Sequence, residues 1–293
     1  MEDILYRGVI DELNIRFVLA DCQQTVNDII IKQDCDPVSA AILSNAVASA
    51  ALVSSLLTED EKYTLKWRCD GQLGLVMADC DAQAHIRAFI SNPHLASSAA
   101  QENDIWGKEG SVSVIKSSST KVLNSGTVDA NFRDLAQDLA FFFSISDQIE
   151  TGIVCKNTFN ADPTKPMRTA RAVMLQALPG CDLAMFDRIR KRLDSEECKQ
   201  LLTPEFVTDN LFEIIVKFLA VGTSGDIVEK PTFSLEHSVS PQFKCTCSRE
   251  NMIAAAASLG KEELEKAFNE DGELRITCQF CNTTHVIKRE DMM

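Results

Sequence analysis

The sequence predicts an α+β protein with a core domain at residues 1–178, a helical linker at 179–230 and a small C-terminal zinc-binding module with four cysteine ligands at 231–293. Three observations support this. Strand and helix patterns come in blocks rather than in strict β-α-β alternation, which indicates α+β architecture. The pattern becomes helical after Leu178-Pro179-Gly180, and two close cysteine pairs stand near the C-terminus. A chain of 293 residues also has the length of about two domains.

The N-terminal segment is predicted to begin with a strand over residues 6–21 and to become helical before residue 35. Asp36 and Pro37 have the residue types of an N-cap and a first helical position. Residues 37–57 carry no charge over a length that could span a bilayer, but they include five serines and one asparagine. Because their apolar content is mainly alanine, membrane insertion would be marginal, and a buried core helix is predicted.

A meander of strands is predicted to follow this helix. Residues 63–70 alternate in polarity, with Leu65, Trp67 and Cys69 on one face, as a half-buried strand requires. Asp70-Gly71 then signals a turn. The remaining core elements are predicted as strands at 73–79, 84–91, 110–118 and 121–129, a helix at 131–149, and closing strands at 153–160 and 169–178.

Two amphipathic helices are predicted in the linker between residues 181 and 220. Because short helices are marginal alone, their apolar faces need the core, each other or a partner as a cover. Ordinary packing on the core is the simplest of these alternatives. The first helix has the stripe Leu183, Phe186, Ile189 and Leu193; the second opens at 203–205, has the stripe Val207, Leu211, Ile214 and Phe218, and stops at Gly222.

Composition limits the classes of partner. The net charge of −14 and the pI of about 4.8 offer no general basic surface for a phosphate backbone, so nucleic acid is not expected. The N-terminus is charged and lacks a continuous apolar region, so neither a signal peptide nor a membrane partner is expected. The prediction is a cytoplasmic protein.

Eleven cysteines are present, and seven of them are scattered without a partner at metal-ligand spacing. Scattered cysteines in a long chain are typical of small buried hydrophobes in a reducing compartment. The seven are Cys22, Cys35, Cys69, Cys80, Cys155, Cys181 and Cys198.

The other four cysteines form a C-x-C pair, Cys245 and Cys247, and a C-x-x-C pair, Cys278 and Cys281. Two close pairs of thiolates can close a tetrahedral zinc site with Zn–S distances near ~2.3 Å. Structural zinc contributes on the order of 10–16 kcal/mol to small modules. A core this small supplies only ~3–5 kcal/mol. Folding of the module is therefore predicted to depend on one Zn²⁺.

Several features of this module leave alternatives open. His285 could replace one cysteine as a ligand, and the flanking Lys244 and Arg249 could favour the thiolate form. Oxidants attack thiolates, so the site is either an inert structural clasp or a redox switch. Between the two cysteine pairs, the sequence predicts helical segments at 252–260 and 261–272, each ending at a glycine. Residues 273–289 are predicted to form two strands joined by a tight turn that holds Cys278 and Cys281.

No enzyme is predicted. Four thiolates close the zinc shell, whereas catalytic zinc keeps an open position. The nucleophile-elbow, phosphate-loop and dinucleotide patterns are absent from the sequence, as is the zinc-deaminase pattern.

The segments FKCTCSRE and CQFCN, with EDGE in the gap between the pairs, resemble the 33 kDa chaperonin (heat-shock protein 33) family of redox-regulated chaperones. SAALVSSLL, YTLKWRCDGQLG, LAFFFSISDQI and the order of core, linker and zinc module extend this resemblance over essentially the whole chain. The sequence departs from the family in lacking a glycine pair before the final core strand, in Asn282 replacing a glycine, and in its seven extra cysteines.

The resemblance implies a holdase that binds unfolding client proteins without ATP. By this resemblance, the reduced, zinc-bound form is a quiescent monomer. Oxidation releases zinc, forms the disulfides Cys245–Cys247 and Cys278–Cys281, and undocks the linker at about 181–230. The active form would often be a homodimer. The alternative is a zinc-ribbon-like binding module in which the four-cysteine site is purely structural.

Overall fold

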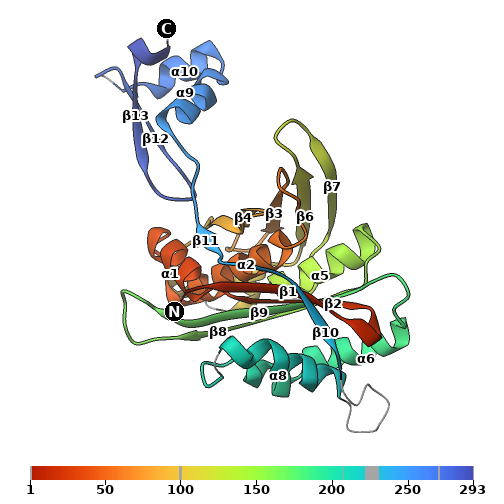
Figure 1. The fold of residues 1–293 in the computed structure, drawn as a ribbon. Helices are drawn as coiled ribbons and strands as arrows, with labels where there is room; N and C mark the ends of the chain where they lie inside the picture. The colour runs from red at the N-terminus through yellow and green to blue at the C-terminus, as the bar shows by residue number, and fades with distance from the viewer. Residues whose placement is uncertain (1, 99–100, 207, 222–230, 270, 293) are drawn as a thin grey trace. The chain divides into compact units, whose positions relative to one another are not determined.

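The computed structural model describes residues 2–98, 101–206, 208–221, 231–269 and 271–292 (Figure 1). The chain divides into two compact units, residues 1–243 and 244–293. This division lies later than the boundary expected at residue 231. The reason is that β10 (Phe233–Val239) and β11 (Gln242–Phe243) each add to a sheet of the first unit.

A five-stranded antiparallel sheet contains both ends of the core segment, in the order β10-β1-β2-β9-β8. The single strand expected over 6–21 is wrong. A 3-10 turn at Asp11–Leu13, followed by Asn14 at φ 50°, folds this segment into a hairpin. The closing strands are confirmed. The bounds are β1 Ile4–Ile10, β2 Ile15–Asp21, β8 Thr151–Phe159 and β9 Met167–Ala177.

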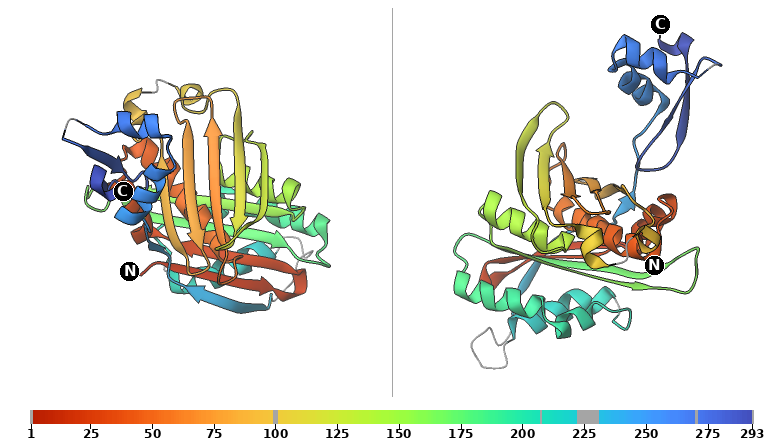
Figure 2. Two further views of the ribbon diagram at one scale, coloured as in Figure 1. Left: turned by 90° about the horizontal axis from the view of Figure 1, so that it is seen from above. Right: turned by 180° about the vertical axis from the view of Figure 1, so that it is seen from behind.

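A six-stranded sheet in the order β11-β5-β4-β3-β6-β7 forms a second layer, and the left view of Figure 2 shows its strands side by side. The predicted meander is confirmed, and Leu65 and Trp67 are buried on its inner face. The bounds are β3 Lys62–Cys69, β4 Leu75–Asp81, β5 His85–Ile90, β6 Gly110–Ser117 and β7 Val122–Asp129.

The main core lies between the two sheets, around α1 (Gln23–Lys32), α2 (Pro37–Ser54) and α5 (Leu135–Ser146). The predicted cap of α2 is confirmed, because Asp36 accepts a hydrogen bond from Ser39 N at 2.8 Å. Among the described residues, α2 is the one helix long and apolar enough to cross a membrane, but 72% of it is buried inside the protein. The core-helix prediction therefore holds.

Two smaller differences concern helices of the core. α5 is shorter than the expected 131–149, because the Asp134 side chain caps its start and leaves Phe132 outside the helix. Two short helices, α3 (Leu95–Ser98) and α4 (Glu102–Trp106), were not predicted.

The linker helices cover the opposite face of the five-stranded sheet (Figures 1 and 2). The described residues of the linker form three helices instead of the expected two: α6 (Leu183–Leu193), α7 (Glu196–Leu201) and α8 (Thr208–Ala220). Their buried side chains pack on Phe17, Val173 and Leu175 of the sheet. Of the alternatives left open by the sequence, packing on the core is observed, together with contacts between the linker helices themselves.

The apolar stripes of the linker were only partly correct. Phe186, Ile189 and Leu193 are buried, but Leu183 is exposed. The second helix begins at Thr208 rather than at 203–205. Its buried face holds Leu211, Phe212, Ile215, Val216 and Leu219, while Ile214 and Phe218 are only partly buried. α8 has apolar residues on two adjacent stripes, so spacing alone could not select the inner one. Val207 and Gly222 lie outside the described residues.

The second unit has a small core. Ala256, Leu274 and Ile287 are its buried apolar residues, with six partly buried side chains around them. Gly260 is the N-cap of α10 at φ −62° rather than a left-handed stop, whereas Gly272 has φ 72°. The elements are α9 Arg249–Ala257, α10 Lys261–Ala267, β12 Glu273–Thr277, β13 Thr284–Lys288 and a 3-10 turn at Arg289–Met292.

Candidate metal centre

The four paired cysteines meet at one point of the second unit. Their sulfur atoms all lie within 4.8 Å of one another. Two approaches run between the pairs, with Cys245 Sγ 3.7 Å from Cys278 Sγ and Cys247 Sγ 3.3 Å from Cys281 Sγ. Sequence reasoning identified all four residues, and the fold brings them together.

The C-x-x-C pair lies in the tight turn between β12 and β13. Cys278 N donates to Thr283 O at 3.0 Å, and Asn282 N donates to Cys278 O at 2.9 Å. This closes the turn through Asn282, whose φ of 55° is left-handed. Asparagine tolerates this conformation better than most residues, so it can replace the glycine that the family pattern has here.

The C-x-C pair lies in the extended segment that leads into α9. Ser248 caps α9 by accepting a hydrogen bond from Asn251 N at 3.1 Å. Asn251 Nδ2 also donates to Thr246 O, the carbonyl between the two cysteines, at 3.0 Å. The first turn of α9 therefore fixes the backbone that presents Cys245 and Cys247.

The donor set fits a tetrahedral metal site. Four thiolates at ~2.3 Å from a zinc ion would lie about 3.8 Å apart, which follows from tetrahedral geometry. The sulfur separations of 3.3 and 3.7 Å, within an overall limit of 4.8 Å, match this size. Four soft sulfur donors suit zinc among the common biological metals. The cluster could therefore hold one such ion.

The thiols of the cluster differ in acidity. Burial raises the pKa of both Cys245 and Cys247. Burial also opposes ionisation of Cys281, but hydrogen bonds from Thr283 and from the neighbouring thiols outweigh it and lower the pKa of Cys281 to about 6. Metal binding requires deprotonated sulfur, so loading of this site would release protons.

Three neighbouring residues behave differently from expectation or were missed. Arg249 forms an ion pair with Asp291 and donates to Val286 O, so its charge is engaged away from the sulfurs. His285 is not part of the cluster of metal-ligating groups found among the described residues. The sequence did not predict a role for Thr283, whose hydroxyl lies 3.3 Å from Cys281 Sγ. Its position two residues after Cys281 was the one sequence feature that could have indicated this contact.

The seven scattered cysteines have a different environment. Cys22, Cys80 and Cys198 are buried and the other four are partly buried, and burial raises the pKa of all seven thiols. For Cys35 and Cys198 the pKa rises to about 12. Thiols held in the protonated form are poorer nucleophiles than thiolates, so this environment disfavours reaction at these seven side chains.

Comparisons with known proteins agree over the whole chain. A family model described as Hsp33 protein matches residues 3–288. The 33 kDa chaperonin of Clostridium perfringens (strain SM101 / Type A) is 27% identical over 299 residues, covering 100% of this chain and 90% of that protein. The 33 kDa chaperonin of Halalkalibacterium halodurans is also 27% identical, over 302 residues, with 100% and 98% covered. The crystal structure of the 33 kDa chaperonin from Thermotoga maritima has the same fold, with a TM-score of 0.78, 21% identity, and 100% and 97% of the two chains covered.

Proposed function

This chain belongs to the Hsp33 family of chaperones, and on that premise we propose that it is a redox-regulated, ATP-independent holdase for unfolding proteins. The observation that carries the proposal is the convergence of four thiols in a unit whose apolar core is very small. The stability of that unit then depends on the chemical state of the sulfurs, so a change at the sulfurs becomes a change of fold.

In the reduced state, Cys245, Cys247, Cys278 and Cys281 would hold one Zn²⁺, which cross-links the segment before α9 to the β12–β13 turn. In the oxidised state, the Cys245–Cys247 and Cys278–Cys281 disulfides would form. Each disulfide takes two electrons from two thiolates, and hydrogen peroxide accepts these electrons and two protons to give two waters. The four sulfurs would then offer no thiolate ligand to a metal ion.

The surface that binds clients would be provided by the linker and the sheet face beneath it. The faces of α6, α7 and α8 that pack on the five-stranded sheet are apolar, and so is the sheet face beneath them. Their release would expose a surface suited to unfolded clients. The proposal places the protein in the cytoplasm, as a monomer when reduced and a homodimer when oxidised, with no catalytic step and neither nucleic acid nor membrane as a partner. We propose a core at 1–178, a linker at 179–230 and a zinc region at 231–293, of which β10 and β11 add to the sheets of the first unit and residues 244–293 form the compact zinc-binding unit.

Light scattering of a heat-unfolded client protein tests this function. The oxidised, zinc-free protein should suppress client aggregation at an equimolar ratio, while the reduced, zinc-loaded protein should not. A variant with alanine at all seven scattered cysteines is the matched control and should switch in the same way. Equal suppression by both states would contradict the switch and leave the sulfur cluster as a structural clasp.

A further inference from the structure

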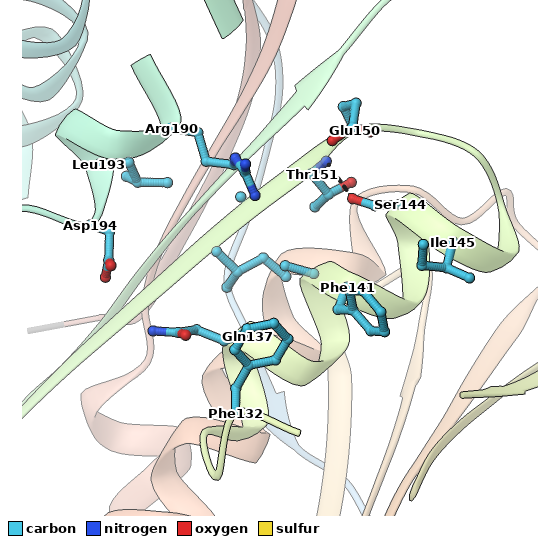
Figure 3. A pocket seen from close by; sticks show the side chains of 13 residues that line it. Phe132, Gln137, Phe141, Ser144, Ile145, Glu150, Thr151, Arg190, Leu193 and Asp194 are labelled. Atoms are coloured by element: carbon cyan, nitrogen blue, oxygen red, sulfur yellow. Dashed lines mark hydrogen bonds between the residues drawn. The ribbon is translucent and has the colours of Figure 1, made fainter. Parts of the chain in front are cut away.

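Two hollows of the first unit lie beside α5. The larger, of about 320 Å³, is bounded by α5, β8 and the linker helix α6, and Figure 3 shows Phe141 of α5 and Arg190 of α6 around it. Because α6 forms one of its walls, this hollow depends on a docked linker. The smaller, of about 150 Å³, lies at the start of α5, against α4 and the adjacent ends of β3 and β6. All of its lining residues fall within 67–138, so it forms without the linker and without the sulfur cluster.

The smaller hollow has an aromatic wall. The chain contains two tryptophans, Trp67 and Trp106, and both line this hollow. Trp67 is buried, and its indole nitrogen donates to Leu135 O at 3.0 Å, which fixes the position of the ring. Trp106 is partly buried, and its indole N–H has no hydrogen-bond partner in the part of the chain that the structure describes. An apolar cavity of about 150 Å³ is large enough for benzene, so a single aromatic ring fits this hollow.

Cationic side chains line the same hollow. Lys108 and Arg133 are exposed, and among the described residues neither forms an ion pair with a carboxylate. Arg133 donates instead to two neutral acceptors, Asn103 Oδ1 at 2.5 Å and Gly107 O at 3.3 Å. Because a guanidinium has five N–H donors, it keeps donors for a ligand. Two cations without a carboxylate partner, in a chain with a net charge of −14, favour an anionic group at this position.

The two acidic residues that line the hollow oppose such a group only weakly. The side chain of Asp138 is buried and accepts a hydrogen bond from Phe132 N at 3.0 Å, so it serves the loop before α5. Burial also raises the pKa of its carboxyl group. The other acidic residue, Glu109, is exposed, and salt screens exposed charges. The mouth of the hollow is therefore richer in donors than in acceptors.

The loop that carries Lys108 is held in place before any ligand binds. Asp70 accepts hydrogen bonds from Lys108 N at 2.7 Å and Glu109 N at 3.0 Å, so its carboxylate is engaged by the loop. Gly107 has φ 72°, and a Cβ at this position would lie 2.0 Å from Asp70 Oδ1, so glycine is required for this approach. Arg133 has φ 54°, which is uncommon for a residue with a side chain. A site with fixed walls avoids the cost of ordering them on binding.

We propose that this hollow binds a small aromatic carboxylate, with its ring against Trp67 and Trp106 and its carboxylate on Lys108 and Arg133. The ring gains burial and aromatic contacts on the tryptophan wall. The carboxylate accepts charge-assisted hydrogen bonds at the mouth, and the free N–H of Trp106 is a further donor. The same ring with an ammonium group would bring a cation beside two others. The inference is independent of the proposed holdase function, because the site lies outside the linker and the sulfur cluster.

Tryptophan fluorescence of the reduced full chain, titrated with benzoate, tests the site because both fluorophores line it. Benzoate should change the emission in a saturable manner and raise the thermal transition of the first unit. Acetate, which lacks the ring, and benzylamine, which reverses the charge, should do neither at the same concentration. No saturable change with benzoate, or an equal change with benzylamine, would overturn the proposal.

Variants at the mouth locate the carboxylate. Lys108→Gln should weaken benzoate binding about threefold, and the double variant with Arg133→Gln about tenfold, because charge pairs near the surface are individually weak. The single variant keeps the test valid if the double variant does not fold. Lys62→Gln, at an exposed lysine at the other end of β3, is the matched control and should keep the affinity of the wild type. Wild-type affinity in Lys108→Gln, or an equal loss in Lys62→Gln, would contradict the proposed contacts.

Trp106→Phe separates the hollow from the surface around it. This variant keeps an aromatic ring at position 106 and leaves Trp67, which is buried, as the one fluorophore. A saturating concentration of benzoate should still change its emission, because Trp67 lines the same hollow. Loss of the response in this variant would place benzoate on the surface at Trp106 and overturn the assignment to the hollow.

Discussion

Neighbouring residues determine how acidic each cysteine is. The cysteine side chain is less acidic in the interior of the first unit and more acidic at the β12–β13 turn, because burial without hydrogen-bond donors disfavours the thiolate whereas donors such as Thr283 favour it. Cys198, on the linker helix α7, has a pKa raised to about 12, while the pKa of Cys281 is lowered to about 6. Local environment, rather than cysteine count, therefore separates a structural thiol from a functional one.

The buried thiols should make the first unit sensitive to alkali. Between pH of about 9 and 12 the unfolded chain has lost the Cys198 proton and the folded chain still holds it. The unfolded state then binds fewer protons, so the free energy of unfolding falls as pH rises. Each such thiol contributes a slope of at most about 1.4 kcal/mol per pH unit. Urea denaturation should show that the free energy of unfolding falls less between pH 8 and pH 10 in Cys198→Ala than in the wild type. An equal fall in both proteins would contradict this.

At the scale of elements, the linker helices are held by more than apolar contacts. Arg171 on β9 is buried and pairs with Asp21 on β2 at 2.8 Å. The same guanidinium donates to Thr203 O at 2.7 Å and Phe206 O at 2.9 Å, two carbonyls of the turn between α7 and α8. One side chain therefore connects the sheet to the linker where the linker has no regular structure.

Arg171→Met should loosen the linker. It leaves the Asp21 carboxylate buried without this partner, which costs about 3–5 kcal/mol when a buried ion pair is broken. Hydrogen exchange should accelerate across residues 196–220 more than in the strands. Arg168→Met, at an exposed arginine of the same strand, is the control and should leave exchange unchanged. Uniform acceleration over the whole first unit would show that Arg171 stabilises the core generally rather than the linker.

At the scale of the whole molecule, the two units have unequal sources of stability. The first unit buries two large apolar clusters on either side of one sheet. In the described part of the second, the buried apolar cluster has three members, and four sulfurs lie close together. Unfolding one unit without the other is therefore physically reasonable, which is what a switch of this design needs.

Metal removal should unfold the second unit alone. A chelator applied to the reduced protein should abolish the protection of residues 244–293 against protease, while the first unit keeps its thermal transition. Structural zinc contributes on the order of 10–16 kcal/mol to small modules, far more than this core can supply. Added Zn²⁺ should restore protection under reducing conditions. Persistence of a protease-resistant second unit in the chelator would contradict the prediction.

Features that depend on local pattern could be predicted from the amino-acid order. Alternation identified most strands, Asp36-Pro37 the start of α2, and cysteine spacing the four members of the sulfur cluster, because each signal lies within a few neighbouring residues. The folded chain was needed to show which stripe of α8 faces inward and that residues 233–243 pair with strands far away in the chain. These depend on contacts between segments separated by many residues. A pattern of apolar residues predicts that one face of a helix or strand is buried, but only the folded chain shows which element packs against that face.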